Sequence, residues 1–408
     1  MPAGRAAWVV PPPLRGSGGH RTIYQSIGAL AAAGYDCHVY VEDQASGSAT
    51  RLRTLAEDYF GPIPATFHCG TAQLGADLRG PHDVVFATAW STADAVRRVS
   101  EPCIKVYFVQ DLEASFLPMS DAHLMAQNTL RYGFEGITIG RWLTRKLGED
   151  FGMRAQHFDF CADRSVYRPL HQSSERSVCF VYQPEKPRRC SAIGSQALAI
   201  VERELPGTQI YFFGSDRPPD LPYPHQHLGL LPIKACNELY NRCAVGLCVS
   251  STNPSRIPFE MMAAGLPVVD IWADNTVYDL PDAGVRLAEP TPESLAFALL
   301  ELLRDEEQRV AMSKAGSAFM QERDLAHGFD QFVHATDALR EPARTRKHAR
   351  PERTYALDPV TAPDHVAARF RSHLDELGPL APPANRASIP RRVGRRLVQT
   401  LRVLFAGP

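Results

Sequence analysis

The sequence lacks several features that would mark common classes of protein. Its nine cysteines include no CxxC pair, so neither a zinc ribbon nor a thioredoxin-type motif is indicated, and an odd number of scattered thiols favours a reducing compartment. No apolar run approaches the roughly 18 to 20 residues of a membrane helix, and the N-terminus lacks a signal-peptide core. A net charge of −1 gives no argument for nucleic acid as a partner. These absences predict a soluble, cytoplasmic chain, and 408 residues are enough for two domains.

The usual ligand motifs are missing as well. GxGxxG and a Walker loop ending in GK[ST] do not occur, which argues against the dinucleotide and nucleoside-triphosphate sites that use them. The histidines have no partners at metal-ligand spacing, there is no DxD motif, and His225–His227 is expected to be a loop. We expect neither a metal nor a resident cofactor.

What is present is an alternation of short apolar runs with amphipathic segments, repeated twice. Such a pattern predicts parallel strands connected by helices, and hence an α/β fold with two doubly wound units that face a cleft. The strands expected in the first half are Ala6–Val10, Cys37–Val41, Val84–Ala87, Ile104–Val109 and Gly136–Ile139, with a helix at Arg21–Ala33. In the second half we expect strands at Val178–Tyr182, Ile210–Phe213, Val245–Val249 and Leu266–Ile271, and helices at Cys190–Leu205, Asn237–Cys243, Pro292–Arg304, Glu306–Phe319, Asp330–Leu339 and Asp364–Leu377.

The stretch from Ala244 to Asp270 organises the second half. Its two strand-like runs enclose a short helix with Pro258 at the first helical position, Glu260 in the first turn and Gly265 after the end. The loop and helix N-terminus should therefore lie at the carboxyl end of a strand, where open α/β sheets bind ligands. We expect the helix dipole to keep Glu260 ionised, as a hydrogen-bond acceptor.

Two loops are candidates for phosphate binding. GSGGH, with Gly16, Ser17, Gly18 and Gly19, follows the first strand and lets the backbone approach a ligand, although a plain tight turn is equally compatible. YQPEKPRRC carries Lys186, Arg188 and Arg189, which suit a diphosphate, although a solvated surface loop is the alternative. After a further strand, VQDLE offers Asp111 either to a hydroxylated substrate or as a helix cap.

The region from Trp8 to Leu339 resembles the retaining GT-B glycosyltransferases of family 4. The resemblance is carried by HLGLLPIKACNELYNRCAVGLCVSSTNPSRIPFEMMAAGLPVV, by the hinge-like FCADRSVYRP and by GSGGH. VQDLE, QNTLRYGF, PRR and TNPSRIPFEMMA look most like bacterial rhamnosyltransferases of the WsaF type, which build surface polysaccharides. The resemblance implies transfer of a sugar, with rhamnose from dTDP-rhamnose favoured, to a glycan or lipid-linked acceptor.

The resemblance also implies roles for individual residues. Glu260 matches the second Glu of the family's E-x7-E signature and would hold the ribose, whereas the first Glu is replaced by Thr252. The diphosphate would be held by Lys186 and Arg189, with Arg188 as a competitor, and Asp111 falls near the acceptor-side position. The donor would also contact the loop residues Asn253, Pro254, Ser255 and Ile257. The family needs no metal.

The expected domains are an N-terminal acceptor domain (1–165), a donor domain (166–320), a helix returning to the first domain (321–340), and a linker with a basic tail (341–408). The tail carries Arg391, Arg392, Arg395 and Arg396 among spaced leucines, which suits either a peripheral contact with the inner face of a membrane or a disordered or docked segment. Two other functions stay open: a non-catalytic GT-B scaffold that binds a glycan, and a Rossmann enzyme that uses NAD or S-adenosylmethionine, for which Glu42 and Asp43 would supply the acid after the second strand.

Overall fold

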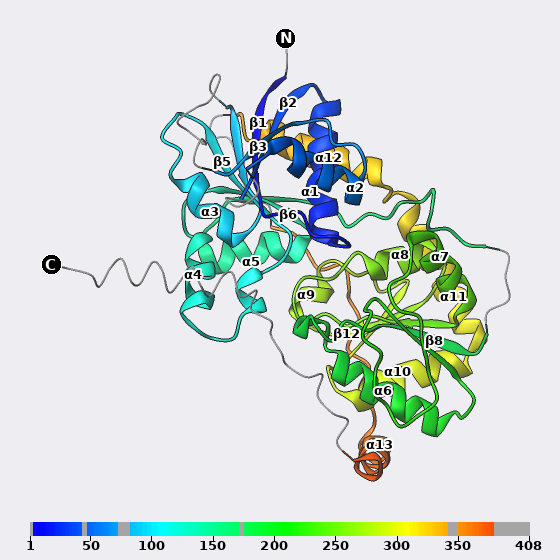
Figure 1. Cartoon of the computed structure of the whole chain (residues 1–408). Coiled ribbons are helices and arrows are strands. Elements are labelled where there is room, and N and C mark those ends of the chain that lie inside the picture. Colours follow the sequence, from blue (N-terminus) through cyan, green and yellow to red (C-terminus); the bar gives the residue numbers. More distant parts are fainter. Residues whose placement is uncertain (1–2, 43–46, 72–81, 171–174, 342–349, 379–408) are drawn as a thin grey trace.

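The computed structural model describes residues 3–42, 47–71, 82–170, 175–341 and 350–378, so Asp43 and the basic tail lie outside the described residues. These residues form a seven-stranded and a six-stranded parallel sheet, each with its own covering helices, in two domains that lie at the upper left and lower right of Figure 1. Within the described ranges no helix has both the length and the apolar character needed to cross a bilayer. The two sheets give the α/β architecture that the sequence predicts.

The first sheet has the order β3-β2-β1-β4-β5-β6-β7, with every pair parallel. Its strands are β1 (Gly4–Val10), β2 (Tyr35–Val41), β3 (Thr66–Cys69), β4 (Val84–Ala87), β5 (Ile104–Val109), β6 (Glu135–Ile139) and β7 (Ala155–Phe158). It is flanked by α1 (Gly18–Ala32), α2 (Ala49–Phe60), α3 (Trp90–Arg97), η1 (Glu113–Phe116), α4 (Asp121–Thr129) and α5 (Arg141–Phe151). The central strands are buried on both faces, which explains their uninterrupted apolar sequences.

The second sheet has the order β10-β9-β8-β11-β12-β13 and is likewise parallel. Its strands are β8 (Ser177–Val181), β9 (Gln209–Phe213), β10 (Gln226–His227), β11 (Val245–Leu247), β12 (Val268–Ile271) and β13 (Val285–Ala288). The helices of this half are η2 (Pro187–Arg189), α6 (Ser191–Glu204), α7 (Ile233–Arg242), α8 (Ile257–Ala263), α9 (Asp274–Val277), α10 (Pro292–Arg304) and α11 (Glu306–Gln321). Helix α6 lies so close to the sheet that a Cβ at Gly194 would be 2.2 Å from Cζ of Phe180.

Helix α12 (Leu325–Ala338) packs against β7 and α1 of the first sheet, although it follows the second half in sequence. Its Phe332 is fully buried in an aromatic cluster with Trp8, Phe86 and Phe108. Trp8 stacks on Phe86 with ring centroids 4.1 Å apart. The core of the first domain is therefore completed by a helix from the far end of the chain.

The described residues after 349 return to the second sheet. Val360 donates its N–H to Leu287 O of β13 and accepts from Glu289 N–H, and the hydroxyl of Tyr355 accepts from Leu287 N–H at 3.1 Å. Helix α13 (Asp364–Leu377) then packs on α6 and α10 with Phe370 buried. The prediction of a linker is therefore wrong in part, because Thr354, Tyr355, Val360 and Ala362 form hydrogen bonds with the second domain.

Several predicted boundaries need correction. The first helix begins at Gly18 rather than Arg21, because Ser17 caps it inside the glycine loop. His225–His227 is not entirely a loop, since Gln226–His227 pairs with β9 at the sheet edge. The last helix of the first domain begins at Leu325 rather than Asp330, because the side chain of Asp324 caps it. Local caps, which apolar periodicity does not detect, set these boundaries.

Candidate functional site

Both sheets reverse their strand order, and the loops at those reversals face each other. The first sheet reverses between β1 and β4, and the second between β8 and β11. Ligands bind open α/β sheets at such points, beyond the carboxyl ends of the strands. The glycine loop (Gly16–His20) follows β1, and the basic loop (Tyr182–Cys190) follows β8. The segment Thr252–Arg256, with the sequence TNPSR, follows β11 and is called the NPSR loop. Contacts of Asp111 with Arg188 and Thr252, and of Gln25 with Arg256, place the basic loop and the NPSR loop against the first domain, which carries the glycine loop.

The glycine loop is shaped by its caps. Ser17 Oγ accepts from His20 N–H at 3.3 Å, and Gly16 has a φ of +74°, which favours glycine. A Cβ at Gly18 would meet no atom within 4 Å, and one at Gly19 would lie 3.6 Å from the Gln110 amide. The loop thus presents open backbone next to the segment that follows β5.

Three cations lie together after β8. Arg188 Nε is 3.4 Å from Asp111 Oδ2, and its guanidinium lies 4.0 Å from the ring centroid of Phe116. Arg189 is buried, and its Nε and Nη1 have no hydrogen-bond partner among the described residues. Burial, together with the neighbouring Arg188 and Arg189, lowers the pKa of Lys186. A buried cluster of this kind strongly favours an anion.

The buried acid beside this cluster does little to neutralise it. Asp270, at the end of β12, is fully buried, and burial raises its pKa to about 8 although Ile271 N–H and Arg189 both act in the opposite direction. Burial therefore favours the uncharged form of Asp270, which reduces the extent to which it compensates the charge of Arg189. This leaves capacity for the negative charge of a ligand, which suits a diphosphate.

The NPSR loop is held against the first domain. The N–H of Asn253 donates to Asp111 Oδ1 at 3.0 Å, and its side-chain amide donates to the carbonyls of Gln110 and Ile139 at 2.9 and 3.0 Å. Thr252 donates its hydroxyl to Asp111 Oδ2 at 3.1 Å. Asn253 and Asp111, which are 142 positions apart in sequence, are therefore direct partners across the cleft.

The rest of that loop leads into α8. Pro254 is buried, Ser255 Oγ accepts from Ile257 N–H at 3.3 Å, and Ile257 is the first residue of the helix. Gly265 has the left-handed φ expected after the helix, +82°. Helix α8 has only seven residues, so the cations, rather than its dipole, supply most of the attraction for an anion.

Glu260 lies in the first turn of α8, where burial acts against the ionised form expected from the helix dipole. Burial raises the pKa of Glu260, and this effect outweighs the opposing influence of Arg256, Tyr167 and Arg21. The helix dipole therefore does not decide its charge. Its electrostatic neighbours are Arg256 of the same segment, Tyr167 of the crossing segment and Arg21 of α1, so Glu260 lies near the first domain.

Arg256 is a site residue that the sequence did not single out. It lies between Glu260 and the first domain, where its Nη1 donates to Gln25 Oε1 of α1 at 3.0 Å. Burial lowers the pKa of Arg256, and Glu260 counters that effect. The sequence does show that Arg256 is the one cation in TNPSRIPFE, which could have marked it as a site residue. The sequence could not show that Arg256 faces the other domain.

Asp111 does not act as a helix cap. The 3-10 turn that follows it has no side-chain cap, and Asp111 accepts from Leu112 N–H at 2.9 Å and from the second domain. The adjacent Glu113 accepts from Trp90 N–H at 2.6 Å, and burial raises its pKa to about 7. Both carboxyls line a small cavity with Thr88, Trp90 and Gln110, on the first-domain side of the cleft.

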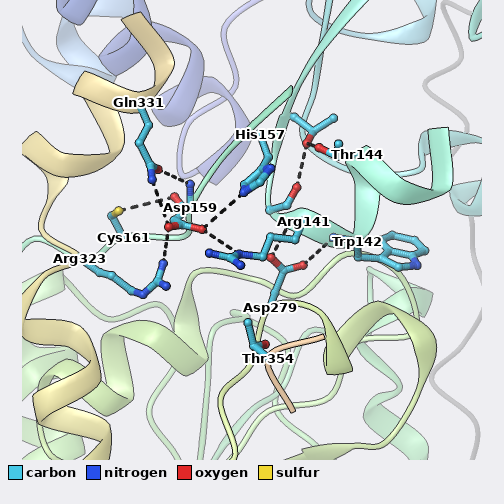
Figure 2. A network of polar contacts seen from close by, with 12 residues as sticks. Arg141, Trp142, Thr144, His157, Asp159, Cys161, Asp279, Arg323, Gln331 and Thr354 are labelled. Carbon is cyan, nitrogen blue, oxygen red and sulfur yellow. Dashed lines mark hydrogen bonds and ion pairs between the residues drawn. The ribbon is translucent and has the colours of Figure 1, made fainter. Parts of the chain in front are cut away.

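A polar network fixes the two domains next to the cleft, as Figure 2 shows. Asp159 in the crossing segment lies 2.6 Å from Arg323 Nη1 and 3.3 Å from Arg141 Nε, and Gln331 Nε2 donates to it at 3.2 Å. Asp279 of the second domain accepts from the N–H groups of Arg141 and Trp142 at 2.7 and 3.1 Å, and so caps α5 of the first domain. The hinge thus combines the ion pairs of Asp159 with hydrogen bonds from the first domain to Asp279, whose pKa burial raises to about 7.

Glycosyltransferase structures share this arrangement of two facing sheets. The chain is similar to Anabaena Alr3699/HepE solved with UDP-glucose, with a TM-score of 0.62 and 14% identity over 81% of this chain and 99% of that one. It is also similar to TarM, with a TM-score of 0.65 and 6% identity over 83% of this chain and 99% of that one. The chain therefore has the GT-B fold of glycosyltransferases, as predicted.

Sequence comparison narrows the similarity further. Residues 176–300 match the family model described as WsaF, C-terminal domain, which confirms the predicted resemblance to WsaF over that segment. The chain is also 33% identical over 227 residues to the O-antigen biosynthesis protein RfbC of Myxococcus xanthus. That match covers 53% of this chain and 18% of the relative, so the chain corresponds to a small part of the relative's length.

Proposed function

We propose that this protein is a retaining glycosyltransferase that transfers a sugar from a nucleotide sugar to a glycan or lipid-linked glycan during surface polysaccharide synthesis. One observation carries the proposal. Lys186, Arg188 and Arg189 form a cluster of cations at a strand-order reversal, and Glu260 lies at the start of the neighbouring helix. A nucleoside diphosphate needs both parts, cations for the phosphates and a carboxyl for the ribose.

The mechanism follows from where charge develops. Cleavage of the bond between the sugar and the phosphate places negative charge on the diphosphate and positive charge on the sugar ring. Arg188 and Arg189 stabilise the leaving diphosphate, and fixed cations in a partly buried cleft do so without rearranging solvent. The hinge charges hold both domains around the reacting groups, which positions the acceptor and excludes water.

Retention of configuration needs a way to deliver the acceptor to the face that the leaving group occupied. In the proposed reaction no enzymic nucleophile takes part, and an oxygen of the departing phosphate accepts the proton of the acceptor hydroxyl. Asp111 and Glu113 line the acceptor side and orient that hydroxyl. Formation of a covalent sugar adduct on either carboxylate would contradict this step.

The finer assignments belong to the same proposal. We favour dTDP-rhamnose as the donor because of the WsaF resemblance, and we expect no requirement for a divalent metal. We further propose a cytoplasmic enzyme whose basic tail, residues 386–402, gives it peripheral contact with a membrane. The membrane contact is tested by flotation with anionic liposomes, in which the full chain is compared with a chain truncated after Leu380. Equal liposome binding by the two chains would contradict a membrane contact through the tail.

The transfer assay uses release of nucleoside diphosphate from dTDP-rhamnose, UDP-glucose and other nucleotide sugars in the presence of simple glycoside acceptors. Acceptor-dependent release should occur with one donor, and proton NMR of the product should show the donor's anomeric configuration. A product of opposite anomeric configuration would refute retention. If no donor released nucleoside diphosphate, the proposed glycosyltransferase activity would be refuted.

A second candidate function is a GT-B scaffold that binds a glycan without catalysis. Thr252 favours it, because it stands where the resemblance implies the first carboxylate of the signature. A scaffold would bind a nucleotide sugar weakly or not at all, and variants of Arg188 would leave its glycan affinity unchanged. Glycan binding without donor turnover would select this alternative.

A further inference from the structure

The carboxylate of Asp111 is held by several donors from the opposite domain. Its Oδ1 accepts from Asn253 N–H at 3.0 Å, and its Oδ2 accepts from the Thr252 hydroxyl at 3.1 Å and lies 3.4 Å from Arg188 Nε. One further bond comes from its own neighbour, Leu112 N–H, at 2.9 Å. Only 13% of the Asp111 side chain is exposed. The first domain thus inserts a carboxyl among donors of the second, where burial raises the pKa of Asp111 and Arg188 and Arg189 oppose that rise.

The donors that hold Asp111 are of the kind that bind phosphate. A guanidinium, a backbone N–H and a hydroxyl are the groups that recognise phosphate oxygens in proteins. Arg188 and the backbone at Asn253 also belong to the proposed diphosphate site. A carboxylate oxygen and a phosphate oxygen accept the same hydrogen bonds, so both cannot use these donors at once.

We propose that Asp111 occupies the position of a donor phosphate and that binding of the nucleoside diphosphate displaces it. The displaced carboxylate then becomes available on the acceptor side of the cleft, so that donor binding precedes acceptor binding. This inference rests on the proposed function. It gives Asp111 a positioning role that links the two substrates.

The charge balance favours the exchange. The cluster contains Lys186, Arg188 and Arg189, whereas Asp111, whose pKa burial raises, contributes at most one negative charge to it. A diphosphate brings at least one more negative charge than a carboxylate, so it compensates the cations better. Release of Asp111 breaks its three contacts with the second domain, and phosphate oxygens then accept from the same donors.

The competing explanation is a fixed tie between the domains, in which Asp111 keeps the NPSR loop in place and never moves. The two explanations predict opposite effects of removing the charge. If Asp111 only connects the domains, removing its charge loosens the contact between them, and the affinity for diphosphate falls or stays the same. If Asp111 competes with the ligand, removing its charge frees the hydrogen-bond donors. The apparent affinity for diphosphate then rises, because a larger fraction of the protein molecules is able to bind it.

The experiment measures dissociation constants of dTDP and UDP by titration calorimetry, with thymidine and uridine as probes that lack phosphate. Asp111→Asn is compared with the wild type and with Asp121→Asn, a matched change at an exposed position in α4. Asp111→Asn should bind the diphosphate about tenfold more tightly than the wild type. This gain is expected if the Asp111 contacts leave the donors free to bind diphosphate in roughly one wild-type molecule in ten. Asp121→Asn should not differ from the wild type, and nucleoside affinity should be the same in all three.

Thermal melting without ligand verifies that Asp111→Asn folds, and Asp111→Ala serves as a second variant with no acceptor left. Equal or weaker diphosphate binding in both variants would overturn the displacement of Asp111 while leaving the proposed function intact. Failure of the wild type and both variants to bind any diphosphate would overturn the proposed function and this inference together. Turnover in Asp111→Asn should fall despite the tighter binding, and unchanged turnover would contradict the acceptor-side role.

Discussion

The hinge network yields a prediction whose size follows from the structure. The change is Asp159→Asn, which keeps the shape of the side chain and removes its charge. Although burial acts to raise it, the pKa of Asp159 is lowered to about 2, mainly because Arg323 and Arg141 stabilise the ionised form. The Asp159 side chain is 7% exposed, so solvent screens these interactions little.

The shift in pKa sets the magnitude. An unfolded Asp has a pKa of about 3.9, so ionisation of Asp159 contributes roughly 2 to 3 kcal/mol to stability at pH 7. Loss of one partner from a fully buried pair costs more, about 3 to 5 kcal/mol. The lower range applies here because the side chains of Arg323 and Arg141 are 17% and 28% exposed and can reach water. We therefore expect a destabilisation of about 2 to 3 kcal/mol.

The pH dependence identifies the cause. Because the folded pKa is below the unfolded one, this stabilisation is present above about pH 4 and is lost as the pH falls toward 2. Urea denaturation followed by tryptophan fluorescence should show the difference between wild type and variant falling to about half at pH 3. Asp330→Asn is the control, because Asp330 is exposed in α12, next to the Asp159 partner Gln331, and this change should have little effect. A difference at pH 7 that stays the same at pH 3 would refute the electrostatic explanation.

Three further predictions follow. Glu260→Ala and Lys186→Ala should each lower turnover by at least about tenfold, through loss of donor or transition-state contacts, and near-normal rates in both would place the site elsewhere. EDTA should leave the transfer rate unchanged, since the proposed chemistry relies on protein cations, and a loss that Mg²⁺ restores would contradict this. Gly194→Ala should destabilise the second domain by about 1 to 3 kcal/mol in a thermal melt, because the new Cβ would be 2.2 Å from Phe180. The control Gly28→Ala, also in a helix but with no atom within 4 Å of the new Cβ, should be neutral or stabilising.

Much of the fold could be predicted from local sequence. Val84–Ala87 and Ile104–Val109 coincide with β4 and β5, because uninterrupted apolar runs mark strands that are buried on both faces. Pro292–Arg304 coincides with α10, which has Thr291 as its cap and proline in its first turn. The start of α1 was missed because Gly18–His20 has the composition of a loop and only the Ser17 cap makes it helical.

The site was predictable in its parts but not in its connections. Sequence spacing singled out the basic loop and Glu260, since each lies next to a predicted strand or helix, and their roles stay predictions. The contacts of Asp111 with Asn253 and of Arg256 with Gln25 depend on how two separately folded domains face each other. The raised pKa of Glu260 likewise depends on burial between domains, which the position of a residue in its own helix does not reveal.

The central claim, a site for a nucleotide sugar at the cations and Glu260, is tested most directly by a thermal-shift panel. The panel contains nucleotides and nucleotide sugars, dTDP-rhamnose included, with NAD and S-adenosylmethionine as controls. A ligand at about 100 times its dissociation constant stabilises the folded state by roughly 2.7 kcal/mol, enough to raise the melting temperature visibly. We predict a shift with one nucleotide sugar that is lost in Glu260→Ala. Shifts with NAD or S-adenosylmethionine alone, or no shift with any nucleotide sugar, would contradict it.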